Sequence, residues 1–507
     1  MRPEDIPLRE AILSGRHTRP DRTEVAEVAA RLGRFLAEPR GALASWFGAG
    51  PAAALRRDPQ RLRGLVDRDL ARLDALIAAQ LDAVLHHPRL QRLEGSWRGL
   101  AWMLAGIGQA APVRVRLLSA RWEELARDFD RAGDFDRSAL FRLVYENEFG
   151  HAGGEPFGLL VIDHEVRHLP ERREAGAAAP VDDVSVLAEL AAVGAAAFAP
   201  MVLAAAPSLL GVDRFEDLAL AQDVTAVLAD ADHARWRALA RREEARFLCV
   251  TLPRVLARPR HDHAAGFAYA EHAPSARERS WFSAGYAFAA TVARAQALHG
   301  WPADVRGIVP DRVGGGLVRG LPEEDVVLGA ATRWPRPALD LALTDRQERD
   351  LVLAGLMPLN TLPYGEAGFA AVQSLQARAD PAPGRPMTAA IANQRLSAQI
   401  NSMLCVSRFA HYVKIIGREL SGAFMTAGEI ERRLQSWLSG YTNASQTPDA
   451  DSRARHPLVA SRVSVQEHAD RPGAFACVIH LQPYYQLDDV ATSFRLVTGF
   501  AATGRAA

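Results

Sequence analysis

The sequence predicts an α/β protein with an N-terminal helical arm, an α/β core and a C-terminal β-rich tail. Three observations support this prediction. A long apolar repeat at helical spacing precedes the first strands, continuous apolar runs alternate with helical patterns in the middle, and period-two alternation begins near the C-terminus. The 507 residues are also too many for one core, so two or three cores are expected.

Residues 1–60 are predicted to form an arm and a linker. Residues 1–37 have the pattern of short amphipathic helices, whereas 38–60 contain three prolines and three glycines, which indicates a linker. A helical segment is expected over 61–110. Its first helix has apolar residues three and four apart and ends at Pro88; these are Leu62, Val66, Leu70, Leu73, Ile77, Leu81 and Val84. A second helix is predicted over LEGSWRGLAWMLAGI (93–107).

Residues 111–457 are predicted to form the α/β core. Val113, Val115 and Leu117 alternate with arginines, which is typical of a half-exposed strand. Continuous apolar runs indicate strands covered on both faces, with helical patterns at 184–198 and 279–298 between them. The runs are FGLLVID (157–163), FLCVTLP (247–253) and the shorter VRGIV (305–309) and ALDLALT (338–344). A further helix is expected to begin at Thr426, with Glu429 completing a capping box.

Residues 458–507 are predicted to form the β-rich tail. RVSVQEH (462–468) and AFACVIHLQ (474–482) alternate on either side of a turn at DRPG (470–473), and SFRLVT (493–498) adds a third strand. The apolar stripe on one side of the second strand consists of Phe475, Cys477, Ile479 and Leu481. Three short strands barely bury a face alone, so the tail either packs on its own chain or completes a sheet with another chain. The spacing leaves both alternatives open.

Composition excludes several classes of function. Lys plus Arg and Asp plus Glu both number 60, so bulk charge favours neither nucleic acid nor an anionic membrane as a partner. Lys414 is the single lysine and stands in YVKII, so a P-loop is absent from the sequence. The longest uncharged stretch, Leu190–Val212, contains Pro200 and is interpreted as two buried helical pieces instead of a membrane span.

The cysteine pattern predicts a reducing compartment. Cys249, Cys405 and Cys477 are an odd number of widely spaced residues without a CxxC pair, so neither a disulfide framework nor a zinc ribbon is expected. The N-terminus lacks the apolar region of a signal peptide. We therefore expect a cytoplasmic protein.

HEVRH (164–168) is the one motif that suggests catalysis. It matches H-E-x-x-H, in which two histidines one helical turn apart bind zinc and the glutamate acts as base. The alternative function is therefore a zinc metallohydrolase. The motif follows an apolar strand-like run directly and precedes Pro170, so the end of a strand is the favoured interpretation.

Two further motifs are interpreted as loops. His261, Asp262 and His263 lack the spacing of ligands on one helix face, and VGGGLVRG (313–320) has Arg319 where a dinucleotide-binding glycine would stand. No catalytic, cofactor-binding or metal-binding residue is predicted. Taken alone, Trp97 is expected to be an ordinary buried aromatic residue, and Arg98 is expected to extend its charged group to solvent.

Several segments together resemble a known family. They are LDAVLHHPRLQRLEGSWRGL (81–100), YENEFGHAGGEPFGLLVIDHEVRH (145–168), ARFLCVTLPRVLARPR (245–260), WPADVRGIV (301–309), GGGLVRGLP (314–322), RLSAQINSMLCVSRFAHYVKIIGR (395–418) and LQPYYQLDDVATSFRLV (481–497). The order and the residues of these segments resemble those of the large subunit of the type VI secretion contractile sheath, the TssC/VipB family. The resemblance extends over roughly residues 60–500. Within it, Glu94, Trp97, Arg98 and Gly99 are expected to be a structural motif.

The resemblance implies a structural role without catalysis. The α/β core would be a two-lobed sheath wall, and the chain would pair with a small sheath subunit of the TssB/VipA type. Such pairs would stack with further copies around an inner tube protein, and a ClpV-type AAA+ unfoldase would dismantle the contracted sheath. C-terminal strands of the family interlock between neighbours. This role is carried onto 461–468 and 474–482, with Val463, Val465, Phe475, Cys477, Ile479 and Leu481 as the residues of inter-subunit β-pairing.

The N-terminus departs from the family pattern. Family members carry an N-terminal helix that the unfoldase binds and then a valine-rich linker strand. Here PLREAILSG (7–15) is a candidate helix, but EPRGALASWFGAGPAAAL (38–55) has no alternating pattern. This departure indicates a divergent paralogue, and the alternative function is a sheath-like adaptor that does not polymerise.

Overall fold

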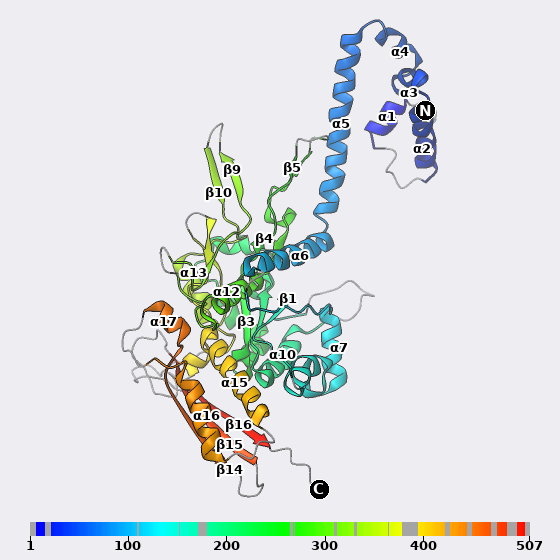
Figure 1. Cartoon of the computed structure of the whole chain (residues 1–507). Helices are drawn as coiled ribbons and strands as arrows, with labels where there is room; N and C mark the ends of the chain where they lie inside the picture. Colours follow the sequence, from blue (N-terminus) through cyan, green and yellow to red (C-terminus); the bar gives the residue numbers. More distant parts are fainter. Residues whose placement is uncertain are drawn as a thin grey trace. The chain divides into compact units, whose positions relative to one another are not determined.

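The computed structural model (Figure 1) describes most of the chain, and its described residues fall into two compact units. The first unit is Met1–Gln91 with Pro259–Arg279, and the second is Arg92–Arg258 with Ser280–Ala507. The described ranges are 7–15, 22–108, 111–151, 153–170, 180–263, 267, 269–308, 312–328, 332–362, 365–377, 394–420, 426–443, 449–467, 474–483 and 494–501.

The first unit consists of short helices packed on one long helix (Figure 1). Its elements are α1 (Leu8–Leu13), α2 (Arg22–Ala37), η3 (Pro39–Gly41), α3 (Ala42–Phe47), α4 (Ala49–Leu55), α5 (Pro59–Leu85), β5 (Asp262–His263), β6 (Tyr269–Ala270) and η11 (Ala276–Glu278). Asp69 of α5 is buried and accepts hydrogen bonds from Arg9 Nε (2.7 Å) and Trp46 Nε1 (2.9 Å). These bonds attach α1 and α3 to α5.

The linker predicted over 38–60 is wrong, because η3, α3 and α4 occupy much of it. Gly48 has φ +88° and separates α3 from α4, a conformation that glycine adopts without strain. Pro51 lies in the first turn of α4, where a backbone N–H has no helical acceptor, so the proline does not interrupt the helix. Glycine and proline therefore stand at helix ends in this segment.

A parallel sheet lies at the centre of the second unit. Its strands follow the order β1 (Leu160–Val166), β2 (Met201–Ala205), β3 (Leu248–Leu252) and β11 (Met357–Pro358). Leu203 packs in one core cluster with α10 (Asp183–Ala197), whereas Val202 packs in a second cluster with α12 (Ala284–His299). Alternate residues of β2 thus contact opposite layers, and the predicted α/β class is confirmed.

The second unit also contains a larger set of helices, 3-10 turns and strands. They are α6 (Pro88–Ile107, which enters the unit at Arg92), α7 (Trp122–Ala132), η4 (Phe135–Arg137), α8 (Ala139–Phe141), η5 (Arg142–Glu146), α9 (Asn147–Phe149), η6 (Pro207–Leu210), η7 (Phe215–Leu220), η8 (Ala226–Ala229), η9 (Ala231–His233), α11 (Ala234–Ala240), η10 (Glu243–Phe247), β4 (Val255–Leu256), β7 (Trp281–Phe282), β8 (Leu317–Val318), β9 (Glu324–Leu328), β10 (Thr332–Arg336), α13 (Asp345–Leu353), β12 (Asn360–Thr361), β13 (Ala367–Gly368), α15 (Ile400–Leu420), α16 (Ala427–Ser439), α17 (Ala450–Arg455), β14 (Leu458–Glu467), β15 (Ala474–Pro483) and β16 (Phe494–Ala501).

Three predicted strands of the core are wrong. Residues 113–120 contain no strand, and neither do the described residues of VRGIV, where Gly307 has φ +76°. ALDLALT contributes one isolated bridge, between Leu339 and Val255. Alternation alone does not make a strand, because the backbone also needs a neighbour with which to form hydrogen bonds.

The stretch Leu190–Val212 is buried, but its second half is not the predicted helix. After α10 the chain forms strand β2 and the 3-10 turn η6, so the prolines bound a short strand. Five buried apolar residues between turn signals are as typical of a central parallel strand as of a helix. Among the described residues, none of the helices has both the length and the apolar character needed to cross a membrane.

Candidate functional site

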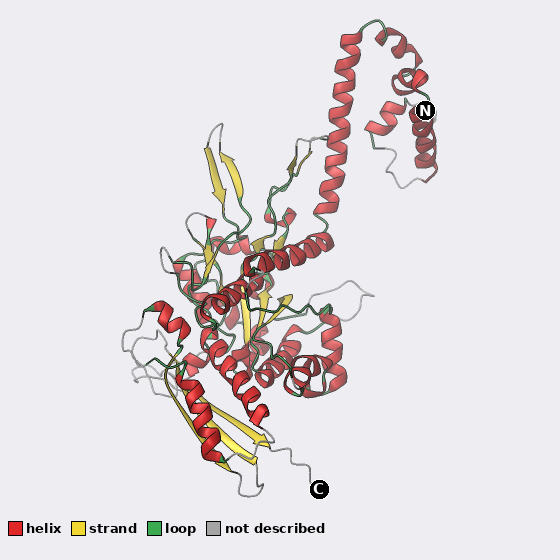
Figure 2. Ribbon diagram, viewed as in Figure 1, coloured by secondary structure: helices red, strands yellow, loops and turns green. Residues whose placement is uncertain are grey.

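The candidate site is the antiparallel sheet β14–β15–β16, next to which α16 lies (Figure 2). β14 and β15 pair from Leu458↔Pro483 to Glu467↔Phe475, with one irregularity between Leu458 and Ala460. β15 and β16 pair from Leu481↔Phe494 to Ala474↔Ala501. All three predicted tail strands are therefore present, whereas the predicted turn at DRPG lies outside the described residues.

One face of this sheet packs against two helices of the same chain. The helical side chains of this core belong to α15 and α16 and recur one turn apart: Cys405, Phe409, Val413, Ile430, Leu434 and Leu438. The predicted capping box starts α16 as expected, because the Thr426 hydroxyl accepts a hydrogen bond from Glu429 N and the Glu429 carboxylate accepts one from Thr426 N. The capping box therefore determines where α16 begins, and the apolar side chains that follow it face the sheet.

The six residues predicted for inter-subunit pairing lie together in this core. Val463, Val465, Cys477, Ile479 and Leu481 are buried, and Phe475 packs at the margin. Burial raises the pKa of the Cys477 thiol to about 11, and the nearby Glu431 carboxylate adds to this effect, so the thiol stays protonated. Their participation in contacts between subunits stays a prediction.

The second predicted motif has Glu94 at its centre. The Glu94 carboxylate accepts hydrogen bonds from Ser280 Oγ (2.6 Å), Arg258 Nε (2.7 Å) and Arg98 Nε (2.8 Å). Burial opposes ionisation of Glu94, but these hydrogen bonds outweigh it and hold the pKa of the carboxyl below its ordinary value. Sequence reasoning missed Arg258 and Ser280, since they are 164 and 186 residues away and carry no local signal.

Two glycines bring α6 into close contact with the segment that contains β7. A Cβ atom on Gly95 would lie 2.0 Å from the Trp281 carbonyl oxygen, and one on Gly99 would lie 2.8 Å from Phe282 Cβ. Only glycine allows this approach of the backbones. Sequence reasoning selected Gly99 and missed Gly95, although the spacing of four places both on one helix face.

The prediction that Trp97 is a buried aromatic is wrong. Trp97 is 59% exposed, and it shares the outer face of α6 with Leu93 and Leu104, which are 55% and 44% exposed. The glycine face of the helix is buried instead. α6 therefore presents an apolar outer face, and Arg98 beside it is held by Glu94.

HEVRH lies at the end of β1 and in the loop after it, as the favoured interpretation predicted. His164 stacks on Trp122 (ring centroids 4.0 Å apart) and lies 3.3 Å from an Asp183 oxygen, whereas His168 stacks on His233 (3.6 Å). In a strand the two histidines do not lie one helical turn apart, so the geometry of a zinc hydrolase is not formed. Within the described ranges, no group of three or more potential ligands could hold a metal ion.

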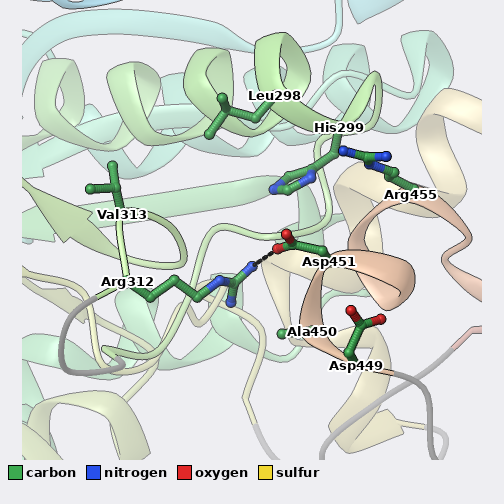
Figure 3. Close-up of a pocket in the computed structure, with 8 residues that line it drawn as sticks. All are labelled: Leu298, His299, Arg312, Val313, Asp449, Ala450, Asp451 and Arg455. Atoms are coloured by element: carbon green, nitrogen blue, oxygen red, sulfur yellow. Dashed lines mark hydrogen bonds and ion pairs between the residues drawn. The ribbon is translucent and has the colours of Figure 1, made fainter.

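A surface hollow of about 470 Å³ lies at the end of α12 and beside α17 (Figure 3). Arg312 in its lining is paired, because Nη2 lies 3.2 Å from Asp451, which also lines the hollow, and 3.0 Å from Asp304 nearby. The neighbouring glycine run is a closely packed loop, in which Gly315 N donates to Asp304 Oδ2 (3.0 Å). This backbone N–H of the loop is therefore already bound by a carboxylate of the same chain.

Together the fold and the site define an α/β protein with an accessory C-terminal sheet, and comparisons with known proteins show its family. Residues 67–376 match the family model for the tail sheath N-terminal domain of VipB (EvpB/VC_A0108), and 389–500 match its gpW/gp25-like domain. The chain is 32% identical over 446 residues to the type VI secretion system sheath protein TssC1 of Pseudomonas aeruginosa, with 85% of each chain covered.

The chain belongs to the VipB/EvpB family of tail sheath proteins, the large sheath subunits of type VI secretion. A solved structure of the anti-feeding prophage baseplate also matches, with 12% identity over 62% of this chain and 73% of that chain. Its TM-score is 0.30, which is too low to carry an argument. The family is one of structural sheath proteins.

Proposed function

We propose that this chain assembles with a small sheath subunit of the TssB/VipA type, and that the pairs stack with further copies into a helical tube in the bacterial cytoplasm. Contraction of the tube drives an inner tube and spike outward. The mechanism is conformational, because energy stored in packing between subunits is released cooperatively. A helical polymer needs contacts that do not close on themselves, and a sheet edge supplies such a contact.

The observation that carries this proposal is the position of β16 at one end of the C-terminal sheet. β15 lies on one side of β16, and the other side has no partner strand among the described residues. An unpaired edge offers a row of backbone donors and acceptors to a strand of another subunit. The six predicted side chains would serve this contact indirectly, because their packing holds the sheet in place while its backbone pairs.

The register shows which backbone groups of β16 face outward. Val463 N donates to a side chain of α16 and therefore points away from β15. Since backbone directions alternate along antiparallel strands, Ile479 opposite Val463 directs its backbone groups toward β16. Its partner Leu496 then faces β15, and Val497 directs its N–H outward.

Negative-stain electron microscopy of the chain co-expressed with its small sheath subunit tests the proposal. The wild type is expected to form striated tubules. Val497→Pro removes one outward N–H without removing a hydrogen bond to β15, so soluble pairs without tubules are expected. The matched control Val497→Thr keeps the N–H and should form tubules. Tubules of normal length with Val497→Pro would exclude strand pairing at this edge.

A non-polymerising adaptor is the second candidate function. The observation that favours it is the helical structure of 39–55, because α3 and α4 occupy the segment where an N-terminal strand for exchange would be expected. Stable pairs with the small subunit, but no tubules even for the wild type, would support the adaptor. Recruitment of a ClpV-type unfoldase through the apolar side of α1 would require this helix to detach, since that side is buried in the first unit.

A further inference from the structure

The outer edge of β14 is covered by side chains of the neighbouring helix α16. Ile430, Leu434 and Leu438 of this helix pack on the face of the sheet. Glu431 and Gln435 follow them by one residue, so they form a second row on the same helix, turned by about 100°. This row reaches over the side of β14 that β15 does not occupy.

The row makes three hydrogen bonds to the backbone of β14. Gln435 Oε1 accepts from Val463 N (2.9 Å), and Gln435 Nε2 donates to the Ser461 carbonyl oxygen (3.2 Å). Glu431 Oε2 accepts from Val465 N (3.0 Å). The side-chain amide of Gln435 therefore offers one acceptor and one donor to the strand, as the C=O and N–H of a single residue in a neighbouring parallel strand would.

The beginning of β14 is covered by the backbone of the same chain. Leu458 N donates to the Tyr441 carbonyl oxygen (3.2 Å), and the Leu458 carbonyl oxygen accepts from Asn443 N (2.9 Å). Both backbone groups of Leu458, the carbonyl oxygen of Ser461 and the N–H groups of Val463 and Val465 thus have partners within the subunit. The β14 edge is therefore chemically unlike the β16 edge, although both end the same sheet.

We propose that Glu431 and Gln435 form a latch that closes a strand-acceptor edge on β14. In the free subunit the latch occupies three of the backbone groups that an extended strand from a second copy of this chain would use. When α16 withdraws these two side chains, the edge becomes able to pair. The latch thereby limits pairing of free subunits to one edge of the sheet. The identity of the incoming strand rests on the proposed function, whereas closure of the edge does not.

Hydrogen exchange of single backbone amides in the full-length chain tests the closure. Glu431→Ala should raise the exchange rate of the Val465 amide about tenfold and leave Val463 unchanged. Gln435→Ala should do the reverse. Each variant is the matched control for the other, and the Ser464 amide, which faces β15, should respond to neither. A change at both amides in both variants, or at neither amide, would contradict the latch.

Self-association of the same chain tests the acceptor role. Light scattering of Glu431→Ala/Gln435→Ala should show dimers or larger species at concentrations where the wild type is monomeric. Glu431→Gln retains the acceptor and should behave as the wild type, and so should Arg433→Ala, which changes an exposed residue of α16. An exchange-competent edge without association would overturn the acceptor role. Failure of the proposed function is a separate outcome, seen as absence of tubules in the wild type with the small subunit.

Discussion

His411 is buried in α15 as a neutral imidazole. Its Nε2 donates to the Ala197 carbonyl oxygen (3.0 Å), and the residue is fully buried. Burial lowers the pKa of His411 from 6.5 to about 4, and the nearby cations Arg408 and Lys414 act in the same direction. The unfolded chain therefore binds a proton at a pH where the folded chain does not, so acid favours unfolding.

Because the folded pKa is lower than the unfolded pKa, stability falls as pH decreases from about 6.5 to about 4 and then levels off. The loss attributable to His411 is about 3 kcal/mol. His411→Gln keeps a donor for Ala197 and removes the titration, so its free energy of unfolding should depend less on pH in this range. Chemical denaturation at several pH values measures the slope. The same substitution at the exposed residue His480 is the control. If His411→Gln and the wild type showed equal slopes of unfolding free energy against pH, His411 would not be the titrating group.

At the scale of elements, the contact of α6 with β7 depends on glycine. Gly95→Ala should lower the free energy of unfolding by at least about 2 kcal/mol, because the carbonyl oxygen of Trp281 is part of the backbone and cannot rotate away. Gly106→Ala on the same helix meets nothing within 4 Å, so it should be neutral or stabilise by up to about 1 kcal/mol. Thermal unfolding measures the stability of both variants. Equal effects of Gly95→Ala and Gly106→Ala would show that the contact between α6 and β7 does not require glycine.

Elements with a long, uniform pattern could be predicted from the sequence. α5, α16 and the strands β14 and β15 each repeat one period over many residues, and their turn and cap signals agree with it. The segments that failed have patterns that fit two structures. Met201–Ala205 is a short apolar run rich in alanine, and 113–117 alternates, yet Arg114 and Arg116 form ion pairs with Glu155 and Glu148.

The functional motifs were predicted less completely than the elements. A local pattern marks Glu94 and Gly99, but the partners that give Glu94 its environment lie in other parts of the chain. The exposure of Trp97 could not be inferred, because both faces of α6 carry large apolar residues. The latch of Glu431 and Gln435 has no sequence signal at all, since acidic and amide side chains are ordinary on a helix.

At the scale of the whole molecule, the C-terminal sheet belongs to the core of its own chain. Deleting 458–507 would expose the apolar faces of α15 and α16, including Phe409 and Leu434, which are completely buried. We expect the truncated chain to lose protection against proteolysis within 400–439, in addition to any loss of assembly. Limited proteolysis with mass spectrometry locates the cuts. Unchanged resistance of α16 would show that the sheet is an independent appendage.

The outer face of α6 has a consequence for how the chain persists in a cell. The molecule has no net charge at pH 7, so electrostatic repulsion does not keep free copies apart. Trp97, Leu93 and Leu104 add an exposed apolar surface to a molecule near its isoelectric point. We therefore expect free chains to aggregate more readily than chains bound to the proposed partner. Balanced synthesis of the partners would thus matter as much as the affinity between them.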